Sequence, residues 1–262
     1  MGNLTLRALM YHDVGPQVPG AFFEGTVLPA EFEKQMAWLA DHGYVGIRPS
    51  EWASRRRNGK PLPDKPVLIT FDDGYAGVAT YALPVIERHG FSAEEFVVTQ
   101  RLGSTNTWDQ ALGYSAVPLM SAEEIVRWSA RGIEFGCHTR THPNLTSLSA
   151  AEISAEVLGS RADLAEIVNQ IPVAFAYPWG FVNKSVYNCV RDAFDLAFST
   201  RRGLNSFITD PHLLRRGAVY ANRSRLDFAC RVMFGLYPLG KLEWILKSGH
   251  TTRADKLKSV CL

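Results

Sequence analysis

Eight short, mostly apolar runs recur along the chain, separated by longer segments of mixed polarity. Runs of this length without regular polar alternation are typical of parallel strands whose two faces are both buried. We therefore expect eight strands, at residues 6–11, 45–47, 67–71, 96–99, 133–137, 173–177, 196–200 and 213–219.

Most of the intervening segments have the features of amphipathic helices. Apolar residues recur at helical spacing between residues 31 and 42, and S-x-x-E sequences that begin at Ser121 and Ser149 are capping boxes. Ser50 is the expected cap of a further helix. Strands that alternate with helices predict an α/β fold with a parallel sheet and right-handed crossovers, either closed as a barrel or open and doubly wound.

The composition is that of a globular protein and excludes several classes. Hydrophobic residues make up 46% and charged residues 21%, and the net charge of +2 gives no reason to expect nucleic acid as a partner. The sequence has no apolar stretch long enough for a transmembrane segment. The four cysteines form no C-x-x-C pair, and the first residues lack the features of a signal peptide, so we expect a cytoplasmic protein.

Three groups of residues follow expected strands, at the end where parallel α/β folds place their functional side chains. The first group is Asp72 and Asp73, after the third strand. Two adjacent carboxylates repel each other, and a metal ion bound by one of them would relieve the repulsion while the other stays available as a base. The alternative is a helix N-terminus, where the helix dipole favours Asp.

The second group is His138 and His142, after the fifth expected strand. Two imidazoles four residues apart can share a divalent ion, although two unrelated loop histidines would leave the same pattern. The third group is Tyr177, Pro178 and Trp179, around the end of the sixth strand. The aromatic rings of this group could form a wall for a sugar ring, or they could pack the rim of a barrel.

Together these groups resemble the motifs of the polysaccharide deacetylases of the NodB homology type, carbohydrate esterase family 4. TFDDG at 70–74 is similar to the first motif of the family, and HTRTH at 138–142 is similar to the second. FAYPWG at 175–180 and DLAFST at 195–200 resemble the third and fourth motifs. The opening MYHDV resembles the branch that includes poly-N-acetylglucosamine deacetylases.

The resemblance implies a distorted parallel (β/α) barrel of about seven to eight strands, similar to a TIM barrel. It also implies a metal-dependent hydrolase that removes acetyl groups from N-acetylated sugars in a glycan or glycan precursor. By motif position, Asp73, His138 and His142 would bind one divalent metal ion, with zinc as the first choice and iron, cobalt or nickel as alternatives. Asp72 would be the catalytic base.

Two positions depart from the family's pattern. Ala176 stands where the third motif usually has the Arg that pairs with the base, and no L-x-H sequence follows the last expected strand to supply the usual general acid. Arg215 and Arg216 are candidates for the missing Arg, or for a structural salt bridge. His12 follows the first strand and is expected either to protonate the leaving amine or to orient a neighbouring Asp.

Two further regions carry expectations. The long loop at 101–119 contains Asp109, another candidate for sugar contact. Residues 1–225 are expected to form the barrel and residues 226–262 a helical extension that packs on it. The extension mixes aromatic with basic residues, so weak contact with a membrane surface is the alternative to packing on the barrel.

Other functions are compatible with parts of this pattern. Non-haem iron oxygenases also use two His and one carboxylate, but usually in an H-x-[DE] sequence on a different fold. Closer alternatives are a metal-dependent amidohydrolase of a small non-sugar amide and a sugar-binding barrel that has lost catalysis. A free base beside metal ligands, as Asp72 would be, favours an enzyme. The resemblance to the polysaccharide deacetylases implies an N-acetylated saccharide as the partner.

Overall fold

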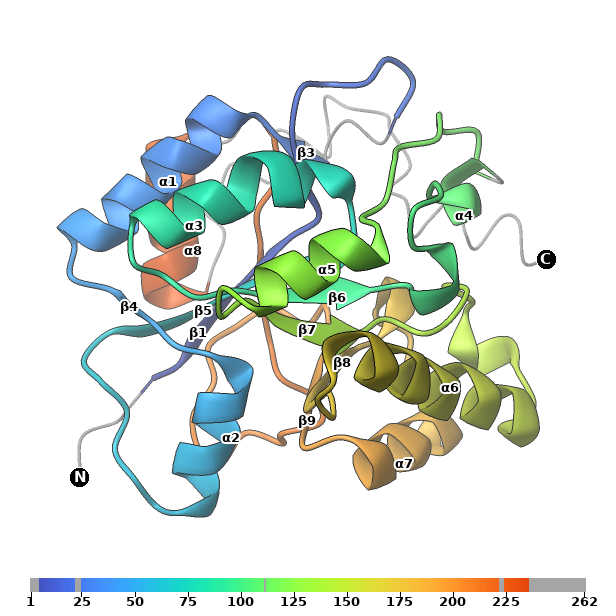
Figure 1. The fold of residues 1–262 in the computed structure, drawn as a ribbon. Coiled ribbons are helices and arrows are strands. Elements are labelled where there is room, and N and C mark those ends of the chain that lie inside the picture. Colours follow the sequence, from blue (N-terminus) through green and yellow to red (C-terminus); the bar gives the residue numbers. More distant parts are fainter. Residues whose placement is uncertain (1–4, 22–24, 111, 222–223, 236–262) are drawn as a thin grey trace, which may run out of the picture.

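A parallel β-sheet forms the centre of the molecule in a computed structural model, which describes residues 5–21, 25–110, 112–221 and 224–235. The strands are β1 Arg7–Tyr11, β2 Asp13–Val14, β3 Thr26–Val27, β4 Val45–Gly46, β5 Pro66–Asp73, β6 Glu94–Val97, β7 Glu134–Cys137, β8 Ala174–Ala176, β9 Leu196–Phe198 and β10 Gly217–Ala218. The main sheet has the order β10-β1-β5-β6-β7-β8-β9, and β4 pairs with the beginning of β5 (Figure 1). The short strands β2 and β3 pair separately.

Helices connect the strands and surround the sheet. They are α1 Pro29–Asp41, α2 Pro49–Arg57, α3 Leu83–Arg88, α4 Thr107–Gln110, α5 Ala122–Ser129, α6 Ala150–Val168, α7 Lys184–Ala193 and α8 Arg225–Phe234. The short helical turns are η2 Val78–Ala82, η3 Thr99–Arg101, η4 Leu145–Ser147 and η5 Pro178–Gly180. Figure 1 shows α1 beside α3, with α5, α6 and α7 continuing around the sheet.

Every strand pairing in the main sheet is parallel, as expected for strands that alternate with helices. The sheet curls, and its two edges approach each other at a parallel bridge between Phe198 on β9 and Leu214, just before β10. The expected barrel-like α/β fold is therefore confirmed, in an incompletely closed form.

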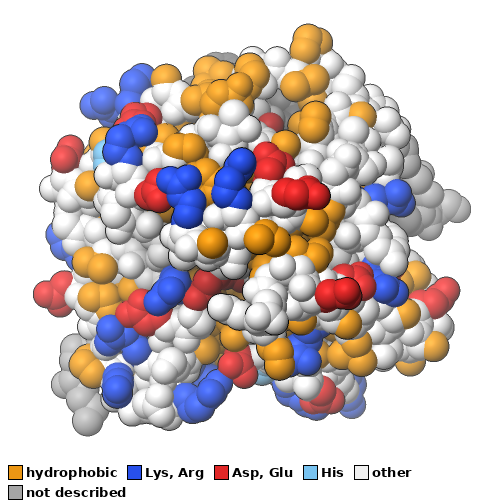
Figure 2. Space-filling model, in the orientation of Figure 1, with side chains coloured by type: hydrophobic (Ala, Val, Ile, Leu, Met, Phe, Trp, Pro, Cys, Tyr) orange, Lys and Arg blue, Asp and Glu red, His pale blue; other side chains and the backbone are white. Residues whose placement is uncertain are grey.

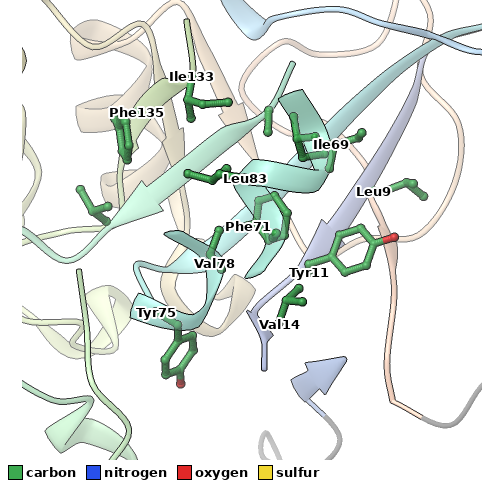
Figure 3. Packing of buried hydrophobic residues seen from close by; sticks show 14 of the residues in the cluster. Leu9, Tyr11, Val14, Ile69, Phe71, Tyr75, Val78, Leu83, Ile133 and Phe135 are labelled. Carbon is green, nitrogen blue, oxygen red and sulfur yellow. The ribbon is translucent and has the colours of Figure 1, made fainter. Parts of the chain in front are cut away.

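Side chains of the strands alternate between two apolar clusters. Leu68 and Phe96 belong to the cluster inside the curled sheet, whereas Ile69 and Phe71 belong to the cluster between the sheet and the helices. Figure 3 shows part of this outer cluster, where Phe71 lies near Tyr11. Because successive residues of a strand point to opposite faces, the same alternation decides which polar side chains face the interior of the barrel.

Two of the three predicted helix caps are confirmed. Capping boxes begin α5 and α6, as their S-x-x-E sequences predict. The prediction that Ser50 caps a helix is wrong, because α2 begins at Pro49. The N–H and hydroxyl of Ser50 instead both donate to the carboxylate of Glu134 on β7. A contact with a strand distant in sequence thus uses the N–H and hydroxyl of Ser50, the residue that the local pattern assigned to a helix cap.

The C-terminal helix α8 packs on the barrel within the described part of the chain. The ring of Phe228 meets that of Trp38 edge to face, and Nε of Arg7 donates to the carbonyl oxygen of Val232 at 3.0 Å. Residues 236–262, which carry most of the expected extension and its membrane contact, lie outside the described residues. The boundary at residue 225 and the cytoplasmic location stay predictions. Among the described residues, none of the helices combines the length and apolar character needed to span a bilayer.

Candidate active site

The three predicted metal ligands meet at the C-terminal end of the sheet. The Nε2 atoms of His138 and His142 lie 3.3 and 3.2 Å from Oδ1 of Asp73. Each of the three residues offers a ligand atom within 4.8 Å of the other two, and all three side chains are buried. The structure thus brings these residues together as a shared ion requires, and their role as ligands stays a prediction.

An unusual backbone conformation turns Asp73 toward the histidines. The strand β5 continues through Asp72 and Asp73 rather than ending at Phe71 as expected. Asp73 and Gly74 both have left-handed φ values, 80° and 79°, a conformation that favours glycine and is uncommon for Asp. The Gly74 N–H donates to the buried carboxylate of Glu95 at 2.9 Å, which helps to hold this turn.

The donor set and its spacing fit a divalent metal ion. Two atoms that each lie about 2.1 Å from an ion in tetrahedral arrangement are about 3.4 Å apart, which is close to the separations at Asp73. Nδ1 of His138 lies 2.8 Å from the carbonyl oxygen of Ala176. That oxygen can only accept, so Nδ1 carries the proton and Nε2 presents its lone pair toward Asp73.

Asp72, the predicted base, faces the barrel interior and is bound by Arg216. Nη1 and Nη2 of Arg216 donate to the two carboxylate oxygens at 2.6 and 2.7 Å, and both residues are buried. Burial raises the pKa of Asp72, but the positive charges of Arg216, His138 and His12 together outweigh it and hold that pKa below its ordinary value. Asp72 is therefore ionised at neutral pH.

Further contacts fix Arg216 in this position. Its Nη1 also donates to Oγ1 of Thr70 at 3.1 Å, and its Nε donates to the carbonyl oxygen of Ser199 at 3.2 Å. Arg215, the other candidate for the missing motif Arg, has an exposed side chain. Of the two candidates it is therefore Arg216 that reaches Asp72, from the position directly before β10 rather than from the third motif.

His12 lies in the short connection between β1 and β2, at the same end of the sheet as Asp72. Its charge contributes to the lowered pKa of Asp72, so the two side chains are within electrostatic reach of each other. The next residue, Asp13, is buried, and burial raises its pKa to about 6 against the opposing effect of a hydrogen bond from Thr26. His12 therefore lies close to both candidate carboxylates, and its two alternative roles stay predictions.

Two tryptophan rings pack against His142. The ring of Trp108 stacks on the imidazole with centroids 4.5 Å apart, and the ring of Trp179 meets it edge to face at 4.7 Å. Both tryptophans keep part of their surface exposed. They therefore wall the candidate metal centre and offer an aromatic surface of the kind that sugar rings contact.

The other predicted sugar contacts are buried. Tyr177 is 1% exposed and donates its hydroxyl to a backbone carbonyl, and Pro178 is buried beside it. Asp109 has no exposed surface and accepts hydrogen bonds from the hydroxyl of Tyr75 and the amide of Asn106. These three side chains belong to the core and to the internal hydrogen bonds of the loop, and their contact with a sugar stays a prediction.

Comparison with known proteins assigns these features to one family. A sequence profile of the polysaccharide deacetylases matches residues 59–193, just over half of the chain, and this range includes the two aspartates and both histidines. The chain belongs to the polysaccharide deacetylase family. The expected relationship is therefore confirmed, and so is the expectation that the protein is a hydrolase.

Matches to individual relatives cover more of the chain than the family profile does. YxkH of Bacillus subtilis, named with the polysaccharide deacetylases, is 26% identical over 231 residues, which cover 87% of this chain and 76% of YxkH. A poly-β-1,6-N-acetyl-D-glucosamine N-deacetylase of Staphylococcus aureus is 24% identical over 177 residues, covering 64% of this chain but only 58% of that enzyme. The structure of the deacetylase PplD from Streptococcus pyogenes, in complex with acetate, matches with a TM-score of 0.73 and 25% identity over 85% of this chain and 96% of that one.

Two buried carboxylates of this deacetylase, on neighbouring positions of β6, were not anticipated from the sequence. Burial and the charge of Asp72 raise the pKa of Glu95 well above its ordinary value. Burial likewise raises the pKa of Glu94, which lies inside the barrel, and the nearby Glu134 raises it further. In the sequence these two acidic residues stand directly before an apolar run. The strand was therefore expected to begin after them.

Proposed function

We propose that this deacetylase is a metal-dependent enzyme that removes the N-acetyl group from an amino sugar, in a glycan or a glycan precursor, and releases acetate. One arrangement carries the proposal: Asp73, His138 and His142 converge beside an ionised Asp72 that Arg216 fixes in place. Hydrolysis of an amide needs both a group that polarises the carbonyl and a base for the attacking water. A barrel that only binds sugars needs neither.

One divalent ion would be held by Asp73, His138 and His142, with zinc as the proposed ion and iron, cobalt or nickel as alternatives. When bound, such an ion polarises the acetyl carbonyl and lowers the pKa of water. The hydrogen bond from His138 to Ala176 orients its imidazole, and burial of all three side chains keeps their charge interactions strong.

Asp72 would accept the proton of the attacking water. The bidentate contact with Arg216 occupies one lone pair on each carboxylate oxygen and leaves the others available. The same contact keeps the carboxylate ionised and oriented at the cost of some basicity. Activity should therefore persist to lower pH than an unpaired buried carboxylate would allow.

His12 would protonate the departing sugar amine, which leaves poorly as an anion. Its place directly after β1, within electrostatic reach of Asp72, supports this role. An imidazole titrates near neutral pH and can reload its proton after each turnover. A role of His12 in orienting Asp72 or Asp13 is the alternative.

An N-acetylated glucosamine is the proposed sugar. The Staphylococcus aureus relative is named for poly-β-1,6-N-acetyl-D-glucosamine, as is a relative from Escherichia coli that is 34% identical over 80 residues, 12% of that enzyme. The partly exposed rings of Trp108 and Trp179 beside His142 supply an aromatic surface for the sugar.

Acetate release from a panel of compounds tests this function. The panel contains N-acetylglucosamine, its β-1,6-linked oligosaccharides, nucleotide sugars and small non-sugar amides, each incubated with chelator-treated protein before and after addition of zinc, iron, cobalt or nickel. We expect acetate from N-acetylated sugars only after a metal is added. Release from the non-sugar amides alone would favour the amidohydrolase alternative, and release at full rate without metal would contradict metal dependence.

Replacement of one predicted ligand tests the metal centre directly. We expect His138→Ala to abolish stoichiometric zinc binding, because two of three buried ligands cannot hold the ion as tightly. His42→Ala is the control, since His42 is exposed at the end of α1. Zinc content and affinity, measured by calorimetry on folded protein, should change in the first variant and not in the second. Unchanged binding in His138→Ala would show that the ion is held elsewhere.

A further inference from the structure

The loop between the two histidines has a backbone that needs external support. Thr139 and His142 both have left-handed φ values, 67° and 64°. Such conformations are unfavourable for residues other than glycine and persist only when surrounding contacts impose them. Inside the loop, Oγ1 of Thr139 accepts the N–H of His142 at 3.0 Å. The contacts that hold the loop from outside therefore bear on where both imidazoles lie.

The helix α6 supplies the densest of these contacts through Glu156. One carboxylate oxygen accepts the backbone N–H groups of Arg140 and Thr141 at 2.8 and 3.0 Å. The other oxygen accepts the hydroxyl of Thr141 at 2.7 Å. A single side chain thus satisfies three donors on two consecutive residues, both of which lie between the histidines.

A second carboxylate on the same helix holds the loop's Arg140. Asp163 accepts from Nε and Nη2 of Arg140, both at 2.9 Å, and from Oγ1 of Thr99 at 2.8 Å. Gly159 lies between the two acidic positions, and a Cβ there would come within 2.7 Å of the Arg140 side chain. The helix face is therefore shaped to receive this loop as well as charged to bind it.

We infer that Glu156 is a positioning residue for the metal centre, and this inference rests on the proposed function. Its carboxylate holds the backbone between His138 and His142 in the conformation that points both Nε2 atoms at Asp73. Without it, the two N–H groups and the hydroxyl lose their partner, and the loop that contains the left-handed residues keeps only part of its support, from Thr139 and Asp163. The site would then have to be ordered when the ion binds, which weakens binding.

The test is the affinity of chelator-treated protein for Zn²⁺ and Co²⁺. We expect Glu156→Ala to weaken binding about 10- to 100-fold, the usual effect of losing a residue that orients a metal ligand. Glu156→Gln should stay close to the unchanged protein, because an amide oxygen can accept both N–H groups while its NH₂ donates to the Thr141 hydroxyl. The visible absorption of bound Co²⁺, which reports ligand geometry, should change only in the Ala variant.

Glu152→Ala is the matched control, because Glu152 lies one turn earlier on α6 and its hydrogen bonds with the described residues all belong to the capping box. This variant should lose helix stability and keep its metal affinity. If Glu156→Ala folds poorly, Thr141→Val removes one of the three donors alone and should give a smaller loss. Unchanged affinity in the folded variants, or an equal loss in Glu152→Ala, would overturn the inference. If the unchanged protein binds no metal, the metal centre of the proposed function fails, and the inference fails with it.

Discussion

Two neighbouring aspartates on β5 meet different partners although they are adjacent in sequence. Asp72 faces the barrel interior, where Arg216 binds both of its oxygens. Asp73 has a left-handed backbone and lies beside His138 and His142. The polarity of an Asp-Asp pair does not distinguish the two residues, whereas strand alternation and one unusual φ value do. The proposed division into base and metal ligand therefore follows from backbone geometry.

Asp72→Asn tests the role of the base. Asparagine has nearly the same shape but cannot accept a proton, so kcat should fall by about two to four orders of magnitude while zinc binding is retained. Because the buried guanidinium of Arg216 loses its counterion, we also expect the variant to be less stable, by up to about 3–5 kcal/mol. Acetate release, zinc content and circular dichroism of the same sample separate these effects. Unchanged activity, or loss of zinc from the variant, would mean that the roles of Asp72 and Asp73 are exchanged.

Arg216→Met tests the electrostatic part of the site. Burial raises the pKa of Asp72 and Arg216 is the largest influence that lowers it, so removal of the guanidinium should raise that pKa. A base works only when ionised, so the acid limb of kcat/KM against pH should move to higher pH. Arg215→Met, at the exposed neighbouring position, should leave the limb where it is. An acid limb that does not move in Arg216→Met would separate Arg216 from the function of Asp72.

His12→Gln distinguishes a general acid from an orienting residue. If His12 protonates the leaving amine, the variant should lose the alkaline limb of its pH profile and most of its activity on N-acetyl substrates. Acetyl esters with activated leaving groups need no such proton and should be largely spared. Rates on both kinds of substrate, measured across the same pH range, decide the question. Equal losses on both would indicate that His12 orients a neighbouring carboxylate instead.

At the scale of elements, local patterns were sufficient where a local interaction decides the structure. The capping boxes of α5 and α6 form as predicted, because each requires only residues of its own first turn. Ser50 fails as a cap because its hydroxyl binds Glu134, a partner 84 residues away. The strand β6 begins two residues earlier than expected because it buries Glu94 and Glu95, which no rule of apolar patterning places in a strand.

The prediction of the candidate site from local sequence patterns succeeded and failed in the same way. Strand ends and residue types were sufficient to assemble the two aspartates and two histidines, since parallel strands bring such positions to one edge. Whether Arg215 or Arg216 faces Asp72 depends on the direction of each side chain just before the short strand β10. The sequence does not determine that direction. A tyrosine at position 177 is compatible both with an aromatic wall for a sugar and with the core, and it is the structure that shows this side chain to be buried.

At the scale of the whole molecule, surface and interior charges behave differently. The net charge is small, and acidic and basic side chains are interspersed on the face shown in Figure 2. Inside the barrel, by contrast, Glu94 is 1% exposed and lies near Glu134, whose carboxylate is already bound by Ser50. Burial, and then the charge of Glu134, raise the pKa of Glu94 well above its ordinary value of 4.5. The dependence of global stability on pH should therefore arise from buried groups of this kind.

Glu94→Gln should stabilise the protein at neutral and alkaline pH. In the folded state Glu94 keeps its proton well above pH 4.5, whereas the unfolded chain loses it there, so its contribution to stability is complete at low pH and is lost as pH rises. Each pH unit in this window lowers the free energy of unfolding by about 1.4 kcal/mol. Glutamine cannot ionise, and its amide can still donate to Glu134.

Urea unfolding of the chelator-treated protein at pH 5 and pH 8 measures this effect, and removal of metal keeps the pH dependence of metal binding out of the result. The gain in unfolding free energy from Glu94→Gln should be larger at pH 8 than at pH 5. Glu166→Gln, at an exposed position on α6, should give the same stability as the unchanged protein at both pH values. Other buried acids, including Glu95, titrate alike in both proteins, so the difference between them isolates Glu94. A constant difference across pH would mean that Glu94 is ionised in the folded protein.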